Sequence, residues 1–137
     1  MLENKAILIV EDNSYIALDF ALAIENLFGR ALGPAGSVDE ALEILSSGEP
    51  VAGAILAARI TDLDPGAVMM ALVERDIPVV VHSETGEAPG FAAEFPHIPI
   101  VFQPVQPQTI ISRLLIEIRR GERDITSAIL LYIMQPP

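Results

Sequence analysis

Residues 6–10 read Ala-Ile-Leu-Ile-Val, and Glu11 and Asp12 follow them directly. Five consecutive apolar residues of this kind are typical of a parallel strand that is buried on both faces. Residues 13–28 have the capping residues and the apolar spacing of an amphipathic helix, and Gly29 stops it. The start of the chain therefore predicts a strand and a helix, with an acidic pair between them.

The same alternation of strand and helix patterns continues along the chain. Further strands are expected near residues 31–35, 52–57, 78–82 and 99–102, and further helices near residues 37–48, 64–75, 91–95 and 107–120. The helix near 91–95 is expected to be short, because glycine and proline crowd that segment. Five strands alternating with five helices predict an α/β fold, a parallel sheet covered on both faces.

The length of the chain, 137 residues with 51% of them apolar, is suited to a single compact domain. We expect this domain to span residues 1–121. Residues 122–137 form a separate apolar C-terminal extension that carries more aliphatic side chains than a solvated tail normally does. We expect the extension either to fold back as a sixth helix or strand or to cover the surface of a partner.

The charge of the chain excludes several classes of function. Eight basic residues against nineteen acidic ones give a net charge of −11, which repels nucleic acid and anionic membrane surfaces. The first residues lack the pattern of a signal peptide, and the apolar runs are too short for a membrane helix. The absence of cysteine fits a reducing compartment, so we expect a cytoplasmic protein.

Functional residues of an open α/β sheet lie beyond the carboxyl ends of its strands. In this chain Glu11 and Asp12 follow the first expected strand. The third strand ends at Ala57, the fourth at Ser83 and the fifth at Gln103. These positions define the candidate site.

Four segments carry a resemblance to a known family. They are residues 7–13 with the acidic pair, 37–42 at the start of the second helix, 77–81 in the fourth strand, and Gln103-Pro104. In their order and spacing they resemble the receiver domains of response regulators in two-component signalling, over roughly residues 5–120. The resemblance implies a three-layer flavodoxin-like sandwich whose five-stranded sheet has the order 2-1-3-4-5.

A working receiver takes a phosphoryl group from a histidine kinase onto an aspartate at the end of its third strand. This chemistry needs a carboxylate nucleophile and Mg²⁺. The resemblance assigns Glu11 and Asp12 to the acidic pair that holds the metal, and Ser83 to the hydroxyl that binds the phosphoryl group. Ala57 stands in place of the nucleophile, and Gln103 in place of the lysine that pairs with the phosphoryl group.

The resemblance therefore predicts a vestigial phosphorylation pocket. Ile100 also stands where many receivers carry a switching tyrosine or phenylalanine. We expect a module that is not an enzyme, needs no cofactor, is not phosphorylated and acts by contact with a protein partner. Glu11 and Asp12 are expected to retain at most a weak Mg²⁺ site. A homodimer through the last helix and residues 122–137 is also expected.

Two other hypotheses stay open at this stage. An active phospho-acceptor could use Asp62 or Asp64, although placing Asp62 at the strand end would bury Arg59 in a central strand. A small-ligand sensor could use the space left by Ala57. His82, next to Ser83, is interpreted as a histidine of the sheet rather than a phosphotransfer residue.

Overall fold

The computed structural model describes residues 2–61 and 63–136 of the chain. In chain order its elements are β1 (Ala6–Val10), α1 (Ser14–Asn26), β2 (Arg30–Ala35), α2 (Val38–Ser46), β3 (Gly53–Ala57), α3 (Gly66–Glu74), β4 (Val79–Ser83), the 3₁₀ helix η1 (Gly90–Ala93), β5 (Ile100–Phe102) and α4 (Pro107–Ile133). All strand pairs are parallel, and the sheet order is β2-β1-β3-β4-β5. The expected α/β fold and strand order are confirmed.

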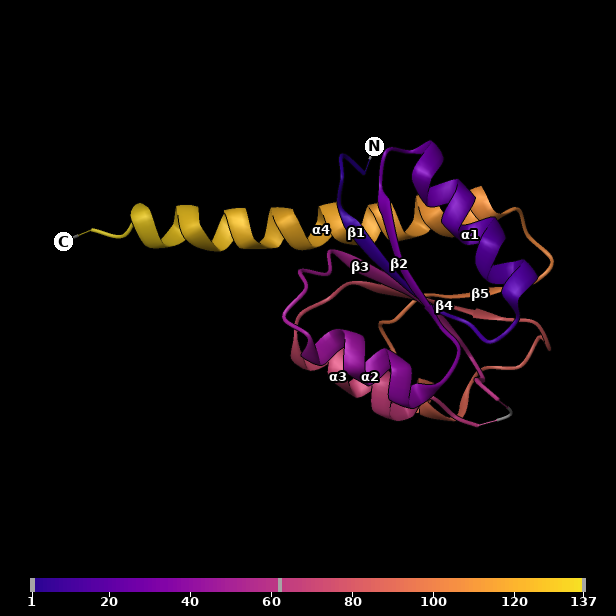
Figure 1. Ribbon diagram of the computed structural model, residues 1–137. Helices are drawn as coiled ribbons and strands as arrows, with labels where there is room; N and C mark the ends of the chain where they lie inside the picture. The colour runs from indigo at the N-terminus through magenta and orange to yellow at the C-terminus, as the bar shows by residue number, and fades with distance from the viewer. Residues whose placement is uncertain (1, 62, 137) are drawn as a thin grey trace.

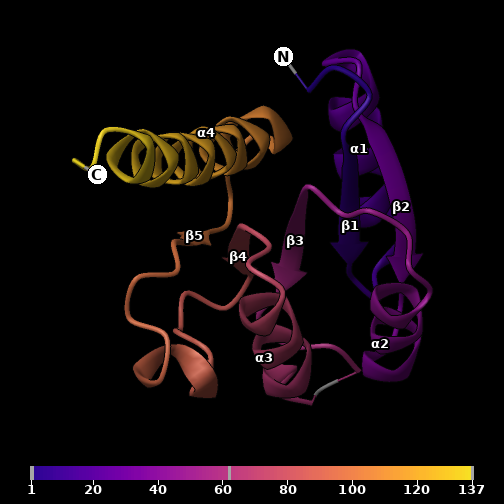
Figure 2. The ribbon, with the colours of Figure 1, turned by 90° about the vertical axis from the view of Figure 1, so that its left-hand side faces the viewer.

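The helices lie in two layers, one on each face of the sheet (Figures 1 and 2). Helices α1 and α4 cover one face, where Phe20 and Leu114 pack with Ile9 and Ile55 of the strands. Helices α2 and α3 cover the other face, and the alternate strand residues pack there. Because successive side chains of a strand point to opposite faces, one unbroken apolar run supplies both cores.

The three central strands are buried at every residue. This is true of β1, β3 and β4, each of which is five residues long. Helix α2 begins as predicted at Ser37, whose side-chain oxygen accepts a hydrogen bond from the Glu40 N–H at 3.1 Å. The acidic pair and the ends of β3 and β4 are thereby brought to one edge of a rigid sheet.

The short helix expected near residues 91–95 is present, but it is a 3₁₀ helix rather than an α-helix. It is the four-residue η1, so the described residues contain four α-helices. Pro89 begins the turn, and Pro96 follows it closely. Because proline cannot continue the α-helical hydrogen-bond pattern, the segment stays short.

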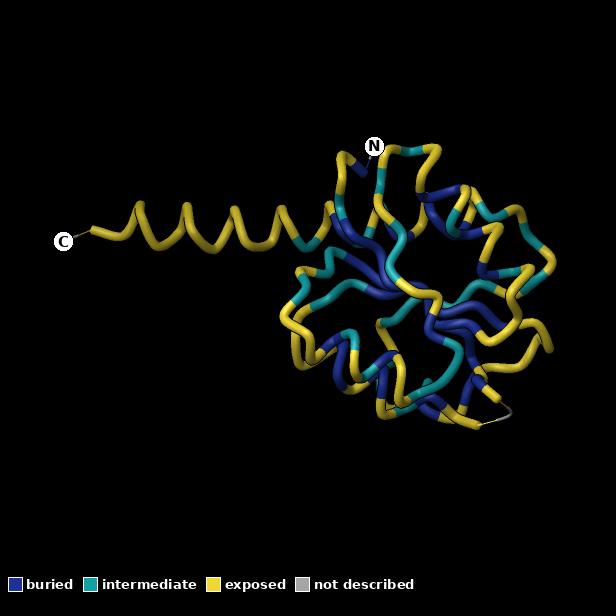
Figure 3. Tube along the Cα trace, viewed as in Figure 1, coloured by how far each residue is buried: buried dark blue, intermediate teal, exposed yellow. Residues whose placement is uncertain are grey.

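The C-terminal extension does not fold back, contrary to one of the two expectations. Helix α4 continues through Gly121 to Ile133 and projects away from the sheet (Figures 1 and 3). The described residues from Glu122 to Pro136 are all exposed, and the ion pair of Glu122 with Lys5, at 3.8 Å, marks where the helix leaves the body. A single glycine weakens a helix but does not end one, so the helical pattern continues.

In the part of the chain that the structure describes, no helix combines the length and the apolar character that a membrane span requires.

Two glycine-to-alanine changes should have opposite effects on stability. A Cβ added at Gly121 meets no atom within 4 Å, so Gly121→Ala should stabilise α4 by about 1 kcal/mol through helix propensity. A Cβ at Gly53 would lie 3.1 Å from Ile118 and 3.2 Å from Leu114, which anchor α4 on the sheet. Gly53→Ala should therefore destabilise the fold by about 1–3 kcal/mol.

Thermal denaturation followed by circular dichroism measures both effects. We expect a higher melting temperature or helix content for Gly121→Ala and a lower melting temperature for Gly53→Ala. A loss of helix content in Gly121→Ala would contradict the continuous path of α4 through this residue.

Candidate functional site

The carboxyl ends of β1, β3 and β4 meet at a cavity of about 230 Å³. The cavity is lined by Glu11, Asp12, Asn13, Ala57, Ala58, Arg59, His82, Ser83, Glu84 and Thr85. Of the five residues assigned to the vestigial pocket, four line this cavity and Gln103 does not. The structure therefore brings together the strand-end residues that the sequence predicted, with the exception of Gln103 after β5.

Ala57 lies at the centre of the site. It ends β3, its Cα is paired with that of His82 on β4, and β1 lies on its other side. This register confirms that β3 ends at Ala57, and Arg59 lies beyond the strand as an exposed residue. A methyl group therefore occupies the middle of the carboxyl edge.

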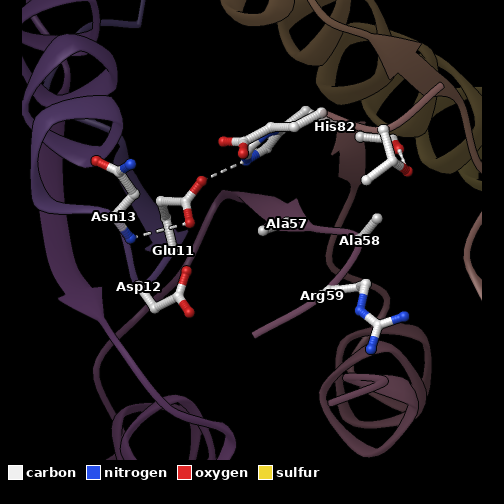
Figure 4. Close-up of a pocket in the computed structure, with 10 residues that line it drawn as sticks. Glu11, Asp12, Asn13, Ala57, Ala58, Arg59 and His82 are labelled. Carbon is white, nitrogen blue, oxygen red and sulfur yellow. Dashed lines mark hydrogen bonds and ion pairs between the residues drawn. The ribbon is translucent and has the colours of Figure 1, made fainter. Parts of the chain in front are cut away.

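The most unusual feature is a buried pair of ionisable side chains that meets across Ala57 (Figure 4). Oε1 of Glu11 lies 3.3 Å from Nε2 of His82, and the two residues are 4% and 1% exposed. Strands β1 and β4 are two strand spacings apart, or roughly 10 Å. The two side chains can span this distance because Ala57 between them is small.

Burial controls the protonation of both groups. It raises the pKa of Glu11 to about 7, against the lowering effect of the Asn13 N–H, which donates to its other oxygen at 3.1 Å. The nearby charges of Glu84 and Asp12 raise the pKa of Glu11 further. Burial also lowers the pKa of His82 to about 4. Near neutral pH the imidazole is therefore uncharged, and a large share of the Glu11 carboxyl groups is protonated.

The carboxyl group of Glu11 and the imidazole of His82 are close, but their relative orientation does not meet the geometry of a hydrogen bond. Within the described residues, Glu11 Oε1 and both ring nitrogens of His82 lack a partner with hydrogen-bond geometry. Buried polar atoms are normally paired, and an unpaired one costs free energy. The ring of His82 packs edge-on against Phe20, with 5.0 Å between the centroids, which holds the imidazole beside Glu11.

Asp12 points elsewhere, although it is the neighbour of Glu11. Its Oδ2 accepts a hydrogen bond of 2.7 Å from the backbone N–H of Thr61, and this bond lowers the pKa of Asp12. Asp12 therefore stays charged and ties the loop after β3 to the end of β1. Only one carboxylate of the acidic pair faces the loop, because the other is drawn inward to His82.

The remaining two pocket residues make contacts of their own. Ser83 is buried, and its hydroxyl donates to the carbonyl oxygen of Glu87 at 2.8 Å, which orders the loop after β4. The side chain of Gln103 accepts a hydrogen bond from the Val105 N–H at 3.1 Å and lies in a separate groove beside α1. Gln103 thus serves its own loop rather than the cavity.

The arrangement does not fit a three-carboxylate magnesium site. The described residues contain no group of three histidine, aspartate or glutamate side chains that could hold a metal ion. Ala57 supplies no oxygen, and Glu11 and Asp12 are directed to different partners. A weak Mg²⁺ site at Glu11 and Asp12 stays a prediction.

His82 was correctly interpreted as a histidine of the sheet, but sequence reasoning did not place it among the residues of the pocket. The signal was present, since His82 interrupts a run of valines at the end of a central strand, where every residue is expected to be buried. A buried histidine normally has a polar partner. The partner could not be found from the sequence, because Glu11 lies on a strand that is not adjacent to β4.

Sequence comparison places the chain in no family: no family model matches it, and no curated protein matches it. Solved structures do match. A response regulator receiver protein from Sinorhizobium medicae WSM419 superposes with a TM-score of 0.77 at 22% identity, covering 88% of this chain and 99% of that one.

A receiver domain protein from Methanospirillum hungatei JF-1 gives a TM-score of 0.75 at 18% identity, covering 88% of this chain and 98% of that one. The chain has the receiver fold. SdrG from Sphingomonas melonis Fr1 is similar at 26% identity with a TM-score of 0.72, over 86% of this chain and 98% of that one. The resemblance to receivers expected from the sequence is therefore confirmed at the level of fold.

The free energy of unfolding should depend on pH in opposite directions in two single variants of this site, Glu11→Gln and His82→Gln. The raised pKa of Glu11 stabilises the folded state fully below about pH 4.5, and that stabilisation is lost as the pH rises through about 7. The lowered pKa of His82 favours the folded state above about 6.5, and that stability is lost as the pH falls through about 4. The two effects largely cancel in the parent protein.

Urea denaturation across this pH range separates the two effects. Glu11→Gln keeps only the histidine effect, so its free energy of unfolding should rise from pH 4 to 6.5 relative to the parent. His82→Gln keeps only the glutamate effect, so its free energy of unfolding should fall from pH 4.5 to 7 relative to the parent. All other ionisable groups are common to the two variants. Parallel pH profiles for the two would contradict a buried Glu11–His82 pair.

Proposed function

We propose that this protein is a receiver-like signalling module of the two-component or phosphorelay type that is not phosphorylated, catalyses no reaction and acts by contact with other proteins. We further propose that it works in the cytoplasm. The observation that carries the proposal is Ala57 at the carboxyl end of β3, in the centre of the pocket. The receiver fold of the structural neighbours supports the signalling class.

The chemistry of phosphoryl transfer argues against phosphorylation at this pocket. A carboxylate must attack the phosphorus, and a cation must neutralise the phosphoryl oxygens. A methyl group cannot attack, and Gln103, which stands in place of the lysine, brings no positive charge. Asp12, whose pKa is lowered by its hydrogen bond from Thr61, would instead place negative charge beside an incoming phosphoryl group.

The alternative acceptors receive less support. Asp62 lies outside the described residues. Asp64 accepts a hydrogen bond of 2.8 Å from the Gly66 N–H at the start of α3, and it does not line the cavity around Ala57. A phosphoryl group on Asp64 would therefore lie away from Ser83 and the acidic pair.

The small-ligand alternative has no specific observation in its favour. The cavity of about 230 Å³ is smaller than the roughly 300–1,000 Å³ of typical ligand sites. Its lining is polar and acidic. Arg59, the basic side chain among the lining residues, already interacts with another group of the protein. The contact function suits the structure better, because large apolar side chains are exposed on α1 and along α4.

The absence of phosphorylation can be tested directly. Incubation with acetyl phosphate and Mg²⁺ should leave the intact mass of the protein unchanged, because Ala57 at the carboxyl end of β3 offers no carboxylate to accept the phosphoryl group. A phosphorylatable receiver treated in parallel serves as the positive control. A gain of about 80 Da, the mass of one phosphoryl group, mapped to Asp62 or Asp64 would establish the alternative acceptor.

Ala57→Asp should strengthen Mg²⁺ binding. The new carboxylate adds an anionic group to the cavity that Glu11 and Asp12 also line, and hard cations bind more tightly as anionic oxygen ligands are added. Without metal the variant should be less stable than the parent, because the added charge lies beside other carboxylates. Isothermal titration calorimetry with MgCl₂ measures the first effect, and thermal denaturation measures the second.

Ala57→Asn is the matched control, since it has the same shape without the charge. It should bind Mg²⁺ no better than the parent. Equal Mg²⁺ binding in parent, Ala57→Asp and Ala57→Asn would show that this edge of the sheet cannot assemble a metal site.

A further inference from the structure

Helix α4 carries a large apolar side chain at every seventh residue, namely Ile111, Ile118, Ile125 and Tyr132. Seven residues are close to two helical turns, so these side chains lie along one side of the helix. Ile111 and Ile118 are buried against the sheet, whereas Ile125 and Tyr132 are 63% and 76% exposed. The side of α4 that packs on the sheet therefore continues, still apolar, beyond the end of the body.

Two more residues widen this side of the projecting helix. Ile129 and Ile133 follow Ile125 at steps of four, so they lie beside it on the same face. We call Ile125, Ile129, Tyr132 and Ile133 the extension stripe. An apolar stripe about 100° wide is the kind of face that helices bury against one another.

The charge distribution indicates which partner the stripe suits. Residues 125–137 contain no Asp, Glu, Lys, Arg or His, so the net charge of −11 lies entirely on residues 1–124. A basic partner would be drawn to the body rather than to the neutral extension. Two copies repel each other least when they meet through their extensions, and each copy offers the same apolar stripe.

We propose that the extension stripe binds the same stripe of a second copy, with the two helices antiparallel. The body of each copy lies on the stripe side of its own α4, because Ile111 and Ile118 face the sheet. Two parallel helices joined through this side would force the two bodies into the same space. An antiparallel pair places the bodies at opposite ends, next to the tips of the partner helices.

The area of contact is that of a weak, reversible dimer. Four side chains at roughly 100 Å² each bury about 400 Å² per copy, or about 800 Å² in total, before flanking contacts are added. Specific interfaces begin at about 1,000 Å². We therefore expect a dimer that dissociates on dilution in the micromolar range. This inference goes beyond the proposed function and does not depend on it, since phosphorylation concerns a different part of the molecule.

Sedimentation equilibrium of the full chain tests the proposal over micromolar to millimolar concentrations. The parent should dimerise, and Ile125→Glu/Ile129→Glu should be monomeric at concentrations at least tenfold higher. The matched control is Leu131→Glu/Met134→Glu, which adds the same charge to exposed residues on the side of the segment that faces away from the stripe. The control should remain a dimer, and circular dichroism should show similar helix content in all three proteins.

Three results would overturn the proposal. A parent chain that stays monomeric at millimolar concentration excludes the dimer. A control variant that dissociates while the stripe variant dimerises assigns the contact to the other side of α4. A monomeric parent that co-sediments with phosphatidylcholine vesicles assigns the stripe to lipid.

Disulfide cross-linking tests the antiparallel direction, because the chain has no cysteine of its own. In an antiparallel pair that places Ile125 opposite Tyr132, Glu122 lies opposite Gln135. A mixture of Glu122→Cys and Gln135→Cys chains should therefore form a mixed disulfide under mild oxidation. Each variant alone should cross-link poorly, since like residues would be roughly 20 Å apart. Efficient cross-linking of Gln135→Cys with itself would show a parallel pair instead.

Discussion

Strand β3 lies between β1 and β4, and none of its five residues is exposed to solvent. This burial requires helices on both faces of the sheet, because the apolar side chains alternate between the faces. The parallel pairing then brings the carboxyl ends of all three strands to one edge. The site and the hydrophobic core are consequences of the same arrangement. A substitution at the end of β3 therefore alters the contacts of residues on both neighbouring strands, β1 and β4.

The site shows how one small residue changes the roles of its neighbours. In a three-carboxylate pocket an acidic residue at the end of β3 would separate Glu11 from His82. With Ala57 there, the two side chains meet, and burial keeps His82 uncharged and raises the pKa of Glu11 to about 7. Asp12 meanwhile anchors the following loop through Thr61. Glu11, His82 and Asp12 thus each contact another part of the protein.

The sequence was sufficient for the fold because its signals are local. The apolar run of β1, the cap at Ser37 and the prolines around η1 each specify a nearby element. Ala57 and Ser83 could be placed in the pocket for the same reason, as strand ends. The contact between Glu11 and His82 could not be predicted, because it joins strands that are not neighbours. The direction of Gln103 depends on one hydrogen bond to its own loop. The path of residues 122–133 depended on whether Gly121 would end the helix, which a single glycine does not decide.

Helix α4 is anchored on the sheet over its first half and free over its second half. The free part, about 13 residues, is roughly 20 Å long. Each degree by which α4 tilts about the edge of the sheet moves the tip by roughly 0.3 Å, given this length. The anchored half is about as long, so a tilt that moved the tip by several ångströms would move the far buried end equally, and the packing of Ile110, Ile111 and Leu114 on the sheet therefore holds the direction of the projecting helix.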